Sequence, residues 1–130
     1  MAAQTDFWGD IAPTAVRTPV AILREQASLL GAKTKNLIEA TVFTESVRGS
    51  FRHVFNLVVP ALDHYTYNLF AIDHGIDFYP VTVLNRDLKL ETEEAFTNWL
   101  RTELSSDNTK KVIGNLLAQV AVDPRSPWAV

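Results

Sequence analysis

The spacing of apolar residues along the chain predicts one helix, four strands and two further helices, in that order. Apolar side chains recur at helical spacing over residues 19–31, where Thr18 and Pro19 match the cap and first turn of a helix. The period changes to two over residues 37–59 and 64–84, which is typical of β-strands. Helical spacing returns after a cap at Thr92, is interrupted over residues 105–108, and resumes over residues 107–121.

The first two strands have a well-defined predicted register. A two-residue turn at Arg48 and Gly49 makes this a tight hairpin. The pairs that follow are Val47 with Ser50, Glu45 with Arg52, Val42 with Phe55, and Ala40 with Leu57. In this register the apolar residues of both strands share one face and opposite charges meet on the other, so the pairing is self-consistent.

The third and fourth strands are expected over residues 64–73 and 76–84, joined by a turn at His74 and Gly75. This turn places Ile72 opposite Asp77, Phe70 opposite Tyr79, and Asn68 opposite Val81. Pro80 has no amide N–H, which favours an edge position for the fourth strand. The expected core face carries Phe70, Ile72, Tyr79, Val81 and Val83.

The chain is therefore predicted to be a single α+β domain over residues 1–130, in two layers, with helices covering one face of a four-stranded antiparallel meander. Residues 1–18, which include Trp8, and residues 122–130, which include Trp128, follow neither period. We expect them to form an irregular N-terminal arm and an irregular tail.

The composition of the chain argues against several classes of function. The formal net charge is -3, which argues against a nucleic-acid binder held by a broad positive field. The absence of cysteine excludes disulfides, thiolate nucleophiles and sulfur-ligated zinc. The first residues do not resemble a signal peptide, and the longest apolar run is far too short to span a bilayer, so we expect a cytoplasmic protein without membrane contact.

No assembled set of catalytic or metal-binding residues is predicted, and no cofactor. His64 lies at the opposite end of its strand from Asp73, His74 and Asp77, which have the chemistry of a turn. Carboxylates at residues 91–94 flank a helix start, where the helix dipole favours negative charge. We expect His53, on the apolar face, to be a buried neutral histidine bonded to a neighbour such as Thr44; a role as a catalytic base is the alternative.

The second face of the sheet is unusually apolar in this register. A solvated face of an antiparallel sheet is normally polar, whereas aromatic residues surrounded by charges are typical of interaction surfaces. The alternative is that the arm or a C-terminal helix covers this face within the chain. The candidate interface residues are Phe43, Val54, Val58, Tyr65, Tyr67, Leu69 and Phe78.

These observations predict a non-enzymatic protein-interaction or accessory protein that self-associates through this face as a homodimer, or binds a protein partner there. The alternative is a small ligand-binding protein or enzyme with a pocket between helices and sheet. In that case His53 and Tyr79, or Tyr67, would supply the polar groups of the pocket.

Overall fold

A computed structural model describes residues 6–121 and has the predicted α+β class, with five strands instead of four. Helix α1 (Pro19–Lys33) precedes the sheet, and helices α2 (Glu93–Leu104) and α3 (Asp107–Ala121) follow it. The strands are β1 (Glu39–Val47), β2 (Ser50–Val59), β3 (Tyr65–His74), β4 (Val81–Val83) and β5 (Leu88–Leu90), and a short 3-10 helix, η1 (Pro60–Leu62), joins β2 to β3. The strands form one antiparallel meander in chain order. The predicted tail and Trp128 lie outside the described residues.

The helices begin where the sequence predicts because their caps are local. The Thr18 side chain accepts a hydrogen bond from Ala21 N (3.2 Å), and Thr92 accepts one from Ala95 N (3.1 Å). Helix α1 continues past Gly31 and ends at Lys33. There the buried Thr34 hydroxyl donates to Ile38 O (3.0 Å) and accepts from Ile38 N (3.1 Å), which ties the end of the helix to the start of the sheet.

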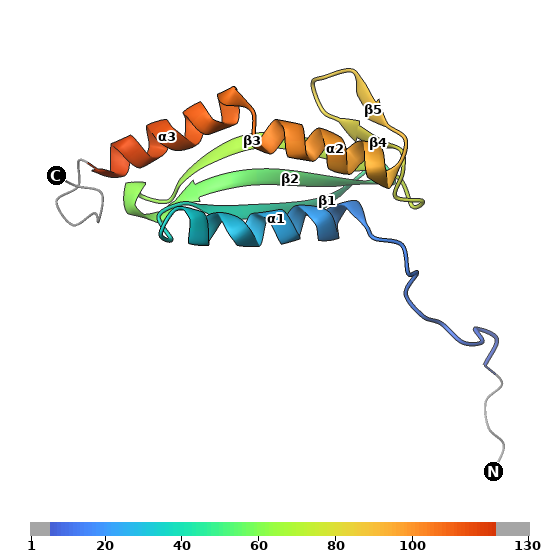
Figure 1. The fold of residues 1–130 in the computed structure, drawn as a ribbon. Coiled ribbons are helices and arrows are strands. Elements are labelled where there is room, and N and C mark those ends of the chain that lie inside the picture. Colours follow the sequence, from blue (N-terminus) through green and yellow to red (C-terminus); the bar gives the residue numbers. More distant parts are fainter. Residues whose placement is uncertain (1–5, 122–130) are drawn as a thin grey trace, which may run out of the picture.

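All three helices lie on one face of the sheet, which we call the inner face (Figure 1). Helix α1 lies along the β1 side, and α2 and α3 follow one another over the other half. The core contains the inward-facing side chains of the sheet and one or two residues from each helix. Its members are Ile22, Leu23, Ile38, Phe55, Leu57, Val59, Phe70, Ile72, Val81, Val83, Leu90, Phe96, Leu100 and Val120.

The β1–β2 register is confirmed at every predicted pair, including Glu45 with Arg52. The Arg52 guanidinium nevertheless makes its two hydrogen bonds to Asp73 of β3, at 2.8 and 3.0 Å. Asp73 is directly opposite Arg52 on the other neighbouring strand. Because β2 is a central strand, Arg52 has one cross-strand partner on β1 and another on β3. The guanidinium binds Asp73 through two parallel hydrogen bonds, one to each carboxylate oxygen.

The fourth strand differs from the prediction. Residues 75–80 form a loop, closed by hydrogen bonds from Phe78 N to Gly75 O (3.2 Å) and from Tyr79 N to Asp77 O (2.8 Å). Strand β4 therefore begins after Pro80, and Ile72 pairs with Val83 instead of Asp77. The edge position belongs to β5, which was missed because three residues carry too little periodicity to identify a strand.

A β-bulge in β3 changes which side chains face the helices. Phe70 pairs with Phe55, but Asn68 pairs with Asn56, so Leu69 is an extra residue in β3. One extra residue reverses the facing of the rest of a strand. Tyr67 and Tyr65 consequently lie opposite Leu57 and Val59, on the inner face.

Candidate functional site

The inner face has two candidate sites. One is a buried pair of histidines, and the other is formed by cavities between the helices and the sheet. The two imidazoles come from neighbouring strands, His53 from β2 and His74 from β3, and are 3% and 6% exposed. Their Nε2 atoms are 2.8 Å apart, and the rings stack with centroids 4.9 Å apart.

The neighbours of this pair determine its tautomers. His74 Nδ1 lies 2.7 Å from the carbonyl oxygen of Gly75, which can only accept, so His74 Nδ1 carries the proton. His74 Nε2 then accepts from the Nε2–H of His53. His53 Nδ1 is left to accept from the Thr44 hydroxyl, 2.8 Å away. The predicted hydrogen bond between His53 and Thr44 is confirmed, and every ring nitrogen of the pair has a partner.

Burial keeps His53 neutral. Desolvation is the main cause that lowers the pKa of His53 to about 4, and the neighbouring His74 and Arg24 lower it further, against a smaller opposite effect of Asp73. An imidazole with so low a pKa is a weak base at neutral pH. Together with its complete hydrogen bonding, this supports a structural role for His53.

The larger cavity is a cleft of about 600 Å³ between α1 on one side and α2 with α3 on the other, which we call the interhelical cleft. Phe55, Leu57 and Leu69 of the sheet form its floor. Its helical walls are mainly apolar, with Ile22, Leu29, Leu30, Leu100, Leu104 and Ile113. The volume is in the range of small-molecule sites, and an apolar lining is typical of them.

The charged residues that line the interhelical cleft are all cations: Arg17, Lys33, Arg101 and Lys110. Arg17 is paired with Glu25. The other three take part in none of the ion pairs found among residues 6–121. In a chain with a net charge of -3, the cleft is therefore a local concentration of positive charge beside apolar surface.

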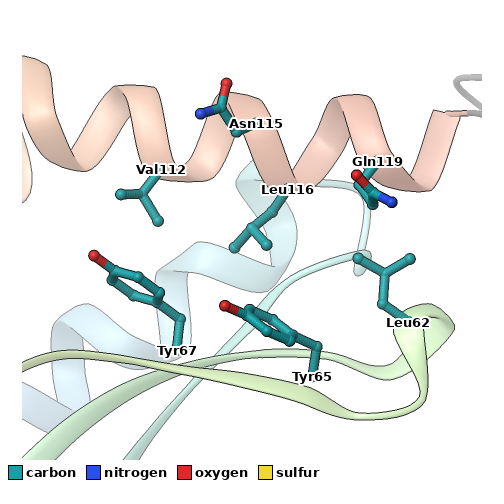
Figure 2. Close-up of a pocket in the computed structure, with 7 residues that line it drawn as sticks. All are labelled: Leu62, Tyr65, Tyr67, Val112, Asn115, Leu116 and Gln119. Atoms are coloured by element: carbon teal, nitrogen blue, oxygen red, sulfur yellow. The ribbon is translucent and has the colours of Figure 1, made fainter.

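A smaller cavity of about 450 Å³ lies between β3 and the second half of α3 (Figure 2). Tyr65 and Tyr67 point from the strand towards α3, opposite Val112 and Leu116. Asn115 and Gln119 supply amides to its lining. Both tyrosines were predicted on the opposite face, and the bulge at Leu69 is the reason that they line this cavity.

The structure places the predicted interface residues on different parts of the molecule. Phe43, Val54 and Val58 do lie on the outer face, where Phe43 is 56% exposed and pairs with Val54. The placement of Tyr65, Tyr67 and Leu69 on that face was wrong, because they line the inner cavities. Phe78 lies in the loop before β4, with its ring centroid 6.0 Å from that of His74.

Of the three predicted pocket residues, Tyr67 does line a cavity, the smaller one beside α3. His53 and Tyr79 line neither cavity. The Tyr79 hydroxyl donates to the carbonyl of Arg17 (3.4 Å), and burial, with a smaller contribution from Glu93, raises the pKa of Tyr79 to about 12. Tyr79 therefore holds the start of α1 to the loop before β4 as a neutral phenol.

Sequence reasoning missed the interhelical cleft as a unit. Its cations lie before α1 and on three different helices, so no local motif connects them. Within residues 6–121, no group of three or more histidine, aspartate or glutamate side chains could hold a metal ion. No helix in this part of the chain has the length and apolar character needed to cross a membrane.

Comparisons of the chain with protein-family models, with curated proteins and with solved structures found no match.

Proposed function

We propose that the protein is a binding protein whose interhelical cleft takes a ligand with an apolar body and a negative charge. The observation that carries this proposal is the combination of an apolar floor with four cationic side chains, and no carboxylate, in the lining formed by the described residues. An apolar ligand gains by leaving water, and its charge gains by lying near unpaired lysine and arginine side chains.

The residues that line the interhelical cleft are typical of a binding site and not of a catalytic site. A catalytic site needs a nucleophile, acid or base held within reach of the reacting atoms. Within residues 6–121 the polar uncharged side chains of the lining are Gln26, Thr97, Ser105 and Thr109, without a histidine beside them. The histidine pair lies elsewhere and is fully hydrogen-bonded.

Dodecanoate should bind more tightly than dodecanol, because both fill the apolar floor but only the carboxylate meets the cations. Reversing two cations in Lys33→Glu/Lys110→Glu should weaken dodecanoate binding by roughly tenfold or more and leave dodecanol binding nearly unchanged. Displacement of a fluorescent probe, followed at two salt concentrations, measures both affinities.

Lys89→Glu is the control for charge reversal outside the cleft, and it changes the net charge by half as much as the double variant. Lys89 pairs with Thr82 and is exposed on β5, outside the cleft lining, so its reversal changes the net charge without altering the cleft. Equal affinities for dodecanoate and dodecanol, or equal losses in the Lys89 and cleft variants, would refute the proposal.

A second candidate function is self-association through the outer sheet face. It is supported by the exposed Phe43 ring beside Val54, which also pairs with Ala71 of β3. Val58 adds to this apolar area, but the face also carries charges and hydroxyl or amide groups, including Glu45, Arg52 and Asn56, so the apolar area is smaller than the sequence predicts.

If this second function holds, Val54→Asp will remain folded and shift the protein from dimer to monomer in sedimentation equilibrium, because an unpaired charge is costly in an interface and cheap in water. Thr41→Asp introduces the same charge on the same face at an exposed position and should have a smaller effect. A parent protein that is monomeric at high micromolar concentration excludes this candidate.

A further inference from the structure

The N-terminal arm, defined as residues 6–16, presents large apolar side chains to solvent. Phe7 is 92% exposed, Trp8 is 80% exposed and Ile11 is 74% exposed. Figure 1 shows the arm running away from the body of the protein from the first turn of α1. Within the arm, Trp8 N donates a hydrogen bond to the Asp6 carboxylate (2.8 Å). Exposed aromatic residues in this number are typical of a segment that binds a protein surface.

The arm and the interhelical cleft are complementary in charge and in polarity. Residues 6–16 include Asp6 and Asp10 and no lysine or arginine. The cleft has an apolar floor, and Lys33, Arg101 and Lys110 in its lining have no carboxylate partner among residues 6–121. The arm is thus an apolar segment with negative charge, which is the class of ligand proposed above for the cleft.

Resting on that proposed function, we infer that the cleft of one molecule takes the arm of a second copy, and that two molecules exchange arms reciprocally. Phe7, Trp8 and Ile11 would cover the apolar floor, and Asp6 and Asp10 would lie near the cationic side chains. A reciprocal exchange is closed by two-fold symmetry, so it gives a dimer and not a polymer.

The base of the arm explains why the cleft takes a second copy's arm and not its own. Thr18 precedes Pro19 and is extended (φ -79°, ψ 153°), as the residue before a proline must be. Its neighbour Arg17 is held at both ends, by the Tyr79 hydroxyl at its carbonyl and by Glu25 at its guanidinium. The arm leaves the body from this anchored point (Figure 1), and entering its own cleft would require the chain to reverse there.

The area involved is sufficient for a stable dimer. A buried aromatic side chain hides roughly 150–250 Å². Four rings from two arms, together with the cleft surface that they cover, therefore bury on the order of 1,200–2,000 Å², which is the range of specific protein interfaces.

Sedimentation equilibrium of the full chain tests this inference. The parent should be a dimer at micromolar concentration, and Phe7→Ser/Trp8→Ser should be a folded monomer, since neither side chain belongs to the core. Lys33→Glu/Lys110→Glu should also be monomeric. Mixing the arm variant with the cleft variant should give a heterodimer weaker than the parent dimer, because one intact arm then meets one intact cleft and half of the interface remains. Ile76→Ser, which alters another highly exposed apolar residue in a different loop, should remain dimeric.

The outcomes separate this inference from its alternatives. A monomeric parent, or a dimer that Val54→Asp abolishes and Phe7→Ser/Trp8→Ser does not, overturns the arm exchange. A monomeric parent whose quencher-accessible tryptophan emission is unchanged by Trp8→Phe also overturns it, in favour of the arm folding into its own cleft. Binding of dodecanoate to the arm variant tests the proposed function separately, because the arm variant has an intact and vacant cleft. If dodecanoate does not bind to this variant, the proposed function itself fails.

Discussion

Phe55→Ala should lower the free energy of unfolding by about 3 to 5 kcal/mol, the usual cost of removing a buried aromatic ring. Phe55 is 2% exposed and stacks on Phe70 of the neighbouring strand, with ring centroids 5.0 Å apart. Phe70 in turn meets the edge of Trp99 in α2 (5.0 Å), so the ring joins the sheet to the helical layer. A loss of this size is a large share of the total stability of a small domain and is measured by urea denaturation.

Thr41→Ala is the matched control for Phe55→Ala. Thr41 is exposed on the outer face and pairs with Asn56, so its truncation leaves no cavity. Its denaturation midpoint should be close to that of the parent. If Phe55→Ala and Thr41→Ala are destabilised equally, the inner and outer faces are assigned incorrectly.

Acid should destabilise the protein between pH 6.5 and pH 4 through the buried histidine pair. The pKa of His53 is lowered from 6.5 to about 4 in the folded protein, so in this window the unfolded chain binds a proton that the folded chain does not. Stability is therefore complete above pH 6.5 and is lost as the pH falls towards the folded pKa, by up to about 3 kcal/mol. Protonation of His53 would also add a proton at Nδ1, so that the Thr44 hydroxyl, 2.8 Å away, would have to accept a hydrogen bond instead of donating one.

The variant His53→Gln isolates this effect. Glutamine can accept from Thr44 and donate to His74 but does not titrate, so the stability of the variant should fall less steeply over this pH range. Urea denaturation of both proteins at a series of pH values gives the difference, and subtraction removes the contribution of the carboxylates that they share. Parallel stability profiles would show that His53 does not remain neutral in the folded protein.

Local patterns determined much of the fold. The Arg48–Gly49 hairpin and its register follow from alternation on two adjacent strands, because one residue of slip would move every apolar side chain to solvent. The helix starts at Thr18 and Thr92 follow from a side chain that caps its own first turn. The hydrogen bond of His53 to Thr44 follows from the same register, since the two residues are direct cross-strand partners.

The succession of one helix, an antiparallel sheet and two helices, together with the first hairpin, was therefore predictable from the sequence, because these features depend on residues close together along the chain. The place of the extra residue in β3, which turns Tyr65 and Tyr67 towards α3 (Figure 2), depends on tertiary packing. Tertiary packing also brings Lys33, Arg101 and Lys110 into the lining of one cleft. A bulge is fixed by the fit of a strand to its neighbours and helices, and a cleft by the packing of separate elements, so neither leaves a periodic signal in the sequence.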